Sequence, residues 1–167
     1  SEKLPPGYHR FEIKHGKKTG SMLLIAAPEA CFQQPVLAGD GKVWGPAVQL
    51  YAVRSRRNWG IGDFTDLYRL VEECGDAGAS IIGLNPLHAL FPHNPPHASP
   101  YSPSSRQFLN ILYIDVEAVP EYAECETARR KVAESEFQAR LQVLRAADVV
   151  DYPGVAAMKR PVLEELF

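Results

Sequence analysis

Aromatic and hydrogen-bonding side chains gather in two loop-like stretches of this sequence, residues 54–62 and 86–106. Trp59 and Tyr101 lie there among glycines and prolines. The polar residues around them are Asn58, Asn85, His88, Asn94, Ser99, Ser102, Ser105 and Arg106. Aromatic faces beside neutral hydrogen-bonding groups suit a polyhydroxylated ligand, which has apolar ring faces and a rim of hydroxyls. The alternative, that Trp59 and Tyr101 fill gaps between loops and core, has equal weight at this point.

A metal site is the next chemistry to consider, because His88, His93 and His97 lie within ten residues of one another. Zinc needs three or four ligands that converge, usually on a rigid element. Prolines at positions 92, 95 and 96 preclude a continuous helix through these histidines. Closeness in sequence therefore does not bring them together, and we expect no metal.

The basic cluster Arg54, Arg56 and Arg57 carries the charge to meet a phosphate. The glycines that follow, at positions 60 and 62, do not form a dinucleotide or P-loop fingerprint. Asp63 also places a carboxylate where a phosphate would sit. A solvated basic edge, or ion pairs that hold the loop, is the favoured interpretation.

Paired carboxylates for glycosyl chemistry must lie roughly 5 to 10 Å apart across the sugar bond. The acidic residues here have simpler explanations. Asp63 and Asp66 fall at a helix start, and Asp115 falls at a strand end. Glu72 and Glu73 belong to the outer face of that helix. The sequence therefore shows no convincing acid and nucleophile pair, and no Ser-His-Asp arrangement.

Three segments are expected to position the two loops. Residues 47–53 form a near-continuous apolar strand, residues 63–74 an amphipathic helix, and residues 80–84 a second short strand. A strand, a helix and a strand in this order predict two parallel, neighbouring strands. The loops that follow parallel strands open on one face of the sheet, where such folds place their working residues.

The predicted helix shows signals along its length. Its apolar face consists of Phe64, Leu67, Val71 and Cys74. Asp63 and Asp66 suit its N-terminus, and Gly78 suits the position after its C-terminus.

The flanking segments have their own patterns. Residues 8–13 and 21–26 alternate as a β-hairpin, which is marginal alone and should belong to a larger sheet. After the long loop 86–106, residues 109–116 look extended. Helices are expected over about 124–133, 135–147 and 153–166. The run Ser135-Glu-Phe-Gln138 predicts a capping box at the start of the second of these.

Composition excludes several function classes. The chain has 167 residues, 46% of them hydrophobic and 23% charged, a net charge of -2 and a pI near 6.2, which exclude a disordered tail and a nucleic-acid binder that works by bulk charge. We find no transmembrane-length apolar run and no signal-peptide pattern. Cys31, Cys74 and Cys125 are few, far apart and expected to be reduced, with Cys74 on the buried helix face. The expected location is the cytoplasm, with no membrane partner.

Several motifs together are more specific. They are Gln49-Leu-Tyr-Ala-Val-Arg-Ser55, Asn58-Trp-Gly-Ile-Gly-Asp-Phe64, Gly83-Leu-Asn-Pro-Leu-His-Ala-Leu-Phe91, Ser99-Pro-Tyr-Ser-Pro-Ser-Ser-Arg106 and Leu112-Tyr-Ile-Asp-Val116. With them, the chain resembles the 4-α-glucanotransferases of glycoside hydrolase family 77, also called amylomaltases or disproportionating enzymes. The resemblance is strongest to the longer bacterial type, which has β-rich domains ahead of its barrel.

The resemblance implies an α/β fold, an incomplete (β/α)8 TIM barrel preceded by a β-hairpin. Residues 1–35 would end the N-terminal β domain, residues 36–116 would form the first two βα units, and residues 117–167 would form a helical insertion. The implied activity moves α-1,4-glucan segments between maltodextrins, or to a glucose or maltooligosaccharide acceptor, with retention and without a cofactor. The family's catalytic carboxylates lie on later strands, so this chain alone is expected to be inactive.

The resemblance also implies roles for individual residues. Tyr101, Ser99 and Trp59 match sugar-contacting positions of the family. Loop support is implied for Asp63, Asn85, His88, Arg106 and Asn110. The sequence departs from many members at Ile111, which follows Asn110 where proline is usual.

Two other functions remain open at this point. One is an α-glucan-binding module without catalysis, and the other is an α-glucan hydrolase of a related barrel family. Exposed strand edges and apolar helix faces also predict that this chain by itself associates with copies of itself.

Overall fold

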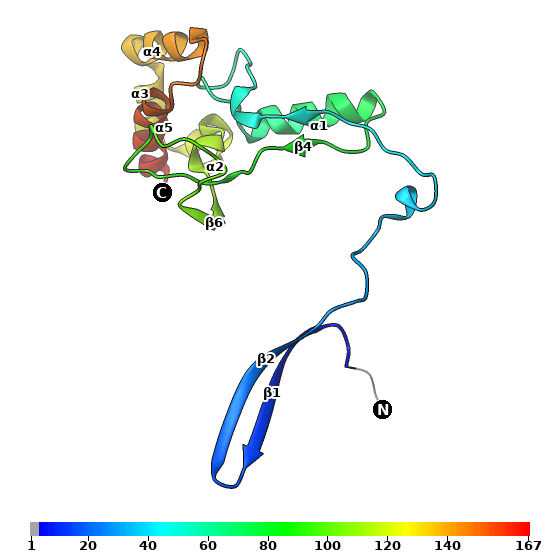
Figure 1. Ribbon diagram of the computed structural model, residues 1–167. Coiled ribbons are helices and arrows are strands. Elements are labelled where there is room, and N and C mark those ends of the chain that lie inside the picture. Colours follow the sequence, from blue (N-terminus) through cyan, green and yellow to red (C-terminus); the bar gives the residue numbers. More distant parts are fainter. Residues whose placement is uncertain (1–3) are drawn as a thin grey trace. The chain divides into compact units, whose positions relative to one another are not determined.

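The computed structural model describes residues 4–167, and the chain divides into two compact units, Ser1–Lys42 and Val43–Phe167 (Figure 1). The first unit contains a hairpin and a short 3-10 turn, Pro35–Leu37. The second contains the helices, two small sheets and both candidate loops. The domain boundaries expected from the family resemblance stay a prediction.

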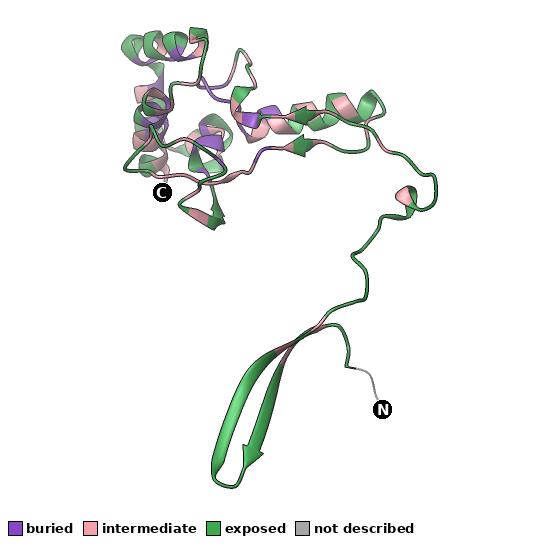
Figure 2. Cartoon of the chain, viewed as in Figure 1, coloured by how far each residue is buried: buried purple, intermediate pink, exposed green. Residues whose placement is uncertain are grey.

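The predicted hairpin is confirmed. Strands β1 (Gly7–His15) and β2 (Lys18–Ala26) pair antiparallel from Gly7 opposite Ala26 to His15 opposite Lys18. Both strands are longer than the sequence pattern indicated, because the turn needs only two residues. Gly16 has a φ of 60° there, which suits the first central position of a II′ hairpin turn. Figure 2 shows the hairpin almost entirely exposed.

The parallel strand pair is also confirmed, but its strands are shorter than expected. β3 (Ala47–Val48) pairs with β4 (Gly83–Leu84), and helix α1 (Phe64–Asp76) lies between them in sequence. The prediction of a strand through residue 53 was wrong, since a 3-10 turn occupies Leu50–Ala52. The backbone N–H of Leu50 donates to the Asn85 side chain at 2.8 Å instead of to a neighbouring strand.

Both ends of α1 follow their sequence signals. The Asp63 side chain accepts from the Asp66 N–H, and the Asp66 side chain accepts from the Asp63 N–H, which is a capping box. Gly78 has a φ of 84° just beyond the helix, and the Ala79 N–H donates to the Cys74 carbonyl at 2.8 Å. These contacts form the Schellman arrangement that glycine favours.

The apolar face of α1 is only partly covered within the described residues. Phe64 and Leu67 pack against the core, and Cys74 is half-buried. Val71 is 51% exposed although it belongs to the same face.

The second candidate loop contains a small sheet that the sequence did not reveal. β5 (His88–Ala89) pairs antiparallel with β6 (Ser105–Leu109), so the loop is closed at its base. The extended segment expected over 109–116 was largely wrong. After β6 the chain forms two 3-10 turns, Ile111–Tyr113 and Val116–Ala118. The Asn110 side chain starts the first of these by accepting from the Leu112 N–H at 3.1 Å.

The rest of the second unit is helical, as predicted. The three predicted helices are α3 (Glu126–Ala133), α4 (Ser135–Ala146) and α5 (Tyr152–Leu166), and they follow a short helix that was not predicted, α2 (Pro120–Glu124). The capping box predicted at Ser135 was wrong, because Glu134 is the N-cap residue and has no side-chain bond to the helix. The Gln138 amide instead donates to the Val132 carbonyl at 2.7 Å. Asp151 caps α5 by accepting from the Gly154 N–H.

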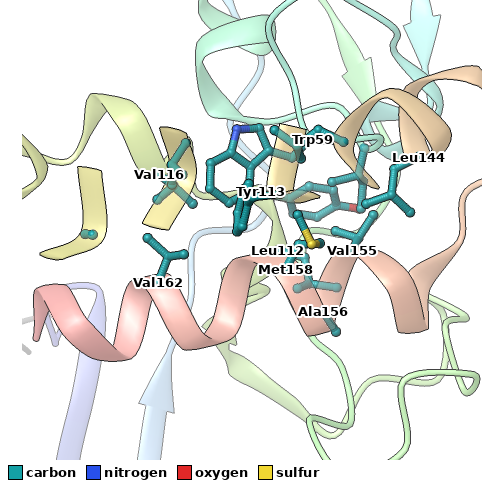
Figure 3. Close-up of a cluster of buried hydrophobic side chains, with 14 of the residues drawn as sticks. Trp59, Leu112, Tyr113, Val116, Leu144, Val155, Ala156, Met158 and Val162 are labelled. Carbon is teal, nitrogen blue, oxygen red and sulfur yellow. The ribbon is translucent and has the colours of Figure 1, made fainter. Parts of the chain in front are cut away.

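The main hydrophobic core joins these helices to the two loops. Figure 3 shows Trp59 of the first loop and Tyr113 of the 3-10 turn in one cluster with Met158 and Val162 of α5. This packing fixes the bases of both loops against α5. Within residues 4–167, none of the helices combines the length and apolar character needed to cross a bilayer.

Candidate functional site

Arg57 organises the first loop by binding three carboxylates. Its guanidinium lies 2.5 Å and 3.2 Å from oxygens of Asp63 and Asp66, and 2.5 Å from an oxygen of Asp115. Burial acts to lower the pKa of Arg57, but the hydrogen bond to Asp63 and the charges of all three aspartates outweigh it and raise the pKa. Arg57 is therefore committed to holding the loop, as the ion-pair interpretation of the sequence proposed.

Asn58 and Gly60 give the first loop its shape. The buried Asn58 amide donates to Asp66 at 2.8 Å and to the Val53 carbonyl at 3.1 Å, and its oxygen accepts from the Gly60 N–H. Gly60 has a φ of 81°, and a Cβ there would lie 2.7 Å from the Cβ of Leu144. Only glycine fits this position, because it alone combines that backbone conformation with the close approach of α4.

Trp59 is enclosed by the core. Its side chain is 2% exposed and meets Phe137 edge-on, with ring centroids 5.2 Å apart. The indole N–H donates to Glu117 at 3.0 Å, which satisfies its polar group. This placement favours the alternative in which Trp59 fills a gap between loop and core over the one in which it contacts a sugar.

Tyr101 and Ser99 lie on one turn of the second loop. The Ser102 N–H donates to the Ser99 carbonyl at 3.2 Å, and Tyr101 lies between these two residues. The Tyr101 side chain is 69% exposed, and Ser99 is exposed as well. Of the two predicted aromatic contacts, Tyr101 is therefore the one whose ring is open to a ligand.

Buried asparagines hold the bases of both loops. Asn85 accepts from the Leu50 N–H at 2.8 Å and donates to the Tyr113 hydroxyl at 3.2 Å. The Asn110 N–H donates to the Leu87 carbonyl at 2.9 Å, which joins the two ends of the second loop. Burial raises the pKa of Tyr113, so its hydroxyl keeps its proton in this network.

The remaining predicted support residues are less engaged. His88 is half-buried in β5, opposite Leu109. Arg106 lies in β6 and is exposed.

Two basic residues of the helical segment were missed by sequence reasoning. Arg145 of α4 donates to the carbonyls of Asn58 and Arg57, at 2.7 Å and 2.9 Å. Lys159 of α5 is 1% exposed, and its ammonium donates to the carbonyls of Leu112 and Ile114, both at 2.7 Å. Lysine and arginine in a helix usually face water, so no pattern in the sequence distinguishes these two.

The acidic residues near the loops are structural rather than reactive. Asp63, Asp66 and Asp115 each bind Arg57, and Asp115 also accepts from the Thr65 hydroxyl at 2.6 Å. A carboxylate tied in this way is poorly placed to transfer a proton or attack a sugar carbon. In the part of the chain that the structure describes, no three His, Cys, Asp or Glu side chains are grouped as a metal site.

Between α5 and the second loop lies a small, mostly apolar cavity of about 70 Å³. Ligand pockets usually begin at about 300 Å³, so this cavity does not hold a sugar chain. The turn that carries Ser99 and Tyr101, by contrast, is open to solvent.

These loops match known proteins throughout. A family model described as 4-alpha-glucanotransferase matches residues 48–167, which include both loops and the helical segment. The chain belongs to the 4-alpha-glucanotransferase family. The resemblance noted in the sequence motifs is thereby confirmed.

Two relatives show how far the similarity extends. A 4-alpha-glucanotransferase of Haemophilus influenzae is 44% identical over 98% of this chain, and one of Mycobacterium tuberculosis is 38% identical over 96% of it. This member of the 4-alpha-glucanotransferase family spans 23% of the length of each.

A solved structure gives the same result for the fold. The crystal structure of amylomaltase from Corynebacterium glutamicum matches with a TM-score of 0.83 and 33% identity, over 98% of this chain and 23% of that one. The mixed α/β arrangement with small sheets is therefore that of an amylomaltase segment.

Proposed function

We propose that this chain is the acceptor-side and donor-side loop segment of a 4-α-glucanotransferase. The complete protein, meaning the reading frame that contains this segment, would move α-1,4-glucan segments between maltodextrins or to glucose. It would do so with retention, through a covalent glycosyl-enzyme. The observation that carries this proposal is the 44% identity to a 4-alpha-glucanotransferase over 98% of the chain.

Within that reaction the chain's own role is binding. Tyr101 would stack on a sugar ring, because its ring is exposed on a turn whose base is closed by β5 and β6. Ser99 on the same turn would hydrogen-bond an acceptor hydroxyl. The aspartates described above are committed to Arg57, so the nucleophile and the acid would come from other parts of the complete protein.

The barrel is part of the same proposal. Parallel strands β3 and β4, with α1 between them in sequence, would be the first two βα units of a (β/α)8 barrel. The half-exposed apolar face of α1 supports this, since a barrel helix packs against neighbouring helices and strands. We further propose a cytoplasmic location and no cofactor.

The deciding experiment incubates maltotriose with the complete protein and, separately, with this chain. We expect glucose together with longer maltodextrins from the complete protein, and no products from the chain alone. Glucose and maltose without longer products would favour a hydrolase. No conversion by the complete protein, with retained maltodextrin binding, would favour a glucan-binding module.

Substitution of Tyr101 tests whether this residue contacts the sugar. Tyr101→Ala in the complete protein should raise the KM for maltotriose about fivefold, because the packing of a sugar face on an aromatic ring contributes on the order of 1 kcal/mol. Tyr68→Ala is the matched control, since Tyr68 is similarly exposed but lies on α1 away from the loop. Equal KM values for the two variants would contradict a sugar contact at Tyr101.

We also propose that this chain associates with copies of itself when it is produced alone. Its hairpin exposes large apolar side chains, among them Tyr8 at 79%, Leu23 at 62% and Ile25 at 58%. Sedimentation should show concentration-dependent oligomers, whereas a single monomeric species at all concentrations would contradict this.

A further inference from the structure

Two consecutive basic residues of α5 bind backbone carbonyls of the second loop and its base. Lys159 donates to Leu112 and Ile114, each at 2.7 Å. Arg160 donates to the Pro92 carbonyl at 2.9 Å, inside the loop itself. The two side chains thus hold the loop at two separate points from one helix.

The Lys159 contacts lie where the loop ends are joined. Leu112 belongs to the 3-10 turn that Asn110 caps, and the Asn110 N–H binds the Leu87 carbonyl across the loop base. Tyr113, the next residue, binds Asn85. A shift of the Leu112 carbonyl would therefore move both ends of the segment that carries Ser99 and Tyr101.

A buried lysine is a costly way to join a helix to a loop, because an ammonium loses its hydration when it is buried. Two carbonyls replace part of that hydration here. The charged groups around Lys159 are Asp63 and Asp66 at the start of α1, Asp115 beyond the 3-10 turn, and Arg57 of the first loop. An apolar side chain would fill the same space without the cost of desolvation. The ammonium therefore contributes by fixing the positions of the two carbonyls that it binds, rather than by filling space.

The Arg160 contact is of a different kind. Its side chain is 33% exposed and also lies 3.5 Å from Glu164 on the same helix. Its removal leaves no buried charge unpaired, so a substitution of Arg160 should perturb the second loop with little effect on overall stability.

We propose that Lys159 and Arg160 are positioning residues for the second loop, which set the placement of Ser99 and Tyr101 without touching the sugar. This inference rests on the proposed function, since it takes those two residues to be the sugar contacts. The helical segment is then a support for substrate binding as well as a packing element.

The test uses three variants of the complete protein, namely Lys159→Met, Arg160→Gln and Val162→Ala. Val162 is the matched control, because it is fully buried on α5 and makes only core contacts. For each variant, kcat and KM for maltotriose are measured together with thermal unfolding and hydrogen exchange of peptides covering residues 86–106.

Lys159→Met is expected to lower kcat/KM about tenfold to a hundredfold, since a displacement of about 1 Å can cost that much. Arg160→Gln should raise KM severalfold with little change in kcat. Both should speed hydrogen exchange in residues 86–106. Val162→Ala should lower the unfolding temperature but leave kcat, KM and the exchange of this loop unchanged.

Wild-type kinetics and wild-type loop exchange in both basic-residue variants would overturn the proposal. The same loop changes in Val162→Ala would also overturn it, because they would follow from general destabilisation. If Lys159→Met does not fold, loop exchange in Arg160→Gln decides. If the wild-type protein does not convert maltotriose, the proposed function fails, while hydrogen exchange still tests whether these residues hold the loop.

Discussion

The hairpin and the loop-bearing unit are built in opposite ways. Strands β1 and β2 pair only with each other among the described residues, and their apolar side chains remain exposed. The loops of Val43–Phe167 contain little regular structure, yet buried polar groups hold them through contacts across long stretches of sequence. A turn between neighbouring residues is therefore enough to form the hairpin. The conformation of the loops in the second unit depends instead on hydrogen bonds between residues that are distant in sequence.

The sharpest test of this comparison concerns aromatic residues. Trp59→Ala should destabilise the chain by about 4 kcal/mol, because it opens a cavity beside Phe137 and leaves Glu117 without its partner. Phe11→Ala in the hairpin should cost less than about 1 kcal/mol, since Phe11 is 45% exposed. Urea unfolding of the two variants measures both, and similar losses would show that the hairpin is packed as firmly as the loop.

Arginine substitutions should give the next largest difference. Arg57→Met leaves the carboxylates of Asp63, Asp66 and Asp115 without their cation, and breaking such a buried network costs about 3 kcal/mol. Arg10→Met removes only an exposed pair with Glu12 at 4.0 Å and should change stability by less than about 0.5 kcal/mol. The midpoints of urea unfolding measure both effects. An unchanged midpoint for Arg57→Met would mean that water, rather than Arg57, stabilises the three aspartates in solution.

Substitution of two glycines with similar backbone conformations distinguishes the cost of backbone strain from the cost of steric overlap with neighbouring residues. Gly60 and Gly16 have φ values of 81° and 60°, but only a Cβ on Gly60 would meet a neighbour closer than 3 Å. Gly16→Ala should cost about 1 kcal/mol from its backbone alone, and Gly60→Ala about 2 kcal/mol or more because Leu144 must also move. Unfolding free energies of the two variants provide the comparison. Equal losses of unfolding free energy in the two variants would show that α4 moves away from residue 60 without a measurable cost.

The smallest expected effect is the pH dependence of stability that the buried Lys159 contributes. Burial lowers the pKa of Lys159 to about 8, below the ordinary 10.5 that applies to the unfolded chain. Between these values the unfolded state binds more protons, so the contribution of Lys159 to stability rises with pH.

Relative to Lys159→Met, the wild-type chain should therefore gain about 1 kcal/mol between pH 7 and pH 9. Paired urea titrations at the two pH values measure this difference, with the exposed hairpin variant Lys14→Met as the baseline. No gain relative to Lys159→Met would contradict the lowered pKa of Lys159. A gain of the same size relative to Lys14→Met would show that the effect is not specific to the buried lysine.

Sequence patterns predicted the features that depend on neighbouring residues. The hairpin, the capping box of α1 and its terminal glycine all follow from side chains within a few positions of the backbone groups they satisfy. The family motifs likewise led to the correct family. The sequence placed Ser99 and Tyr101 in the second loop, where the structure shows both to be exposed.

Tertiary structure alone decided which residues of the loops are buried and which strands end early. Trp59 is buried in the core, where it makes an edge-to-face contact with Phe137, which is distant in sequence. The first strand ends after Val48 because Asn85 takes the Leu50 N–H. Lys159 can be buried because two backbone carbonyls about 45 residues earlier accept hydrogen bonds from its ammonium. Each outcome depends on a partner that is distant in sequence, and the spacing of residues along the chain carries no signal for such a partner.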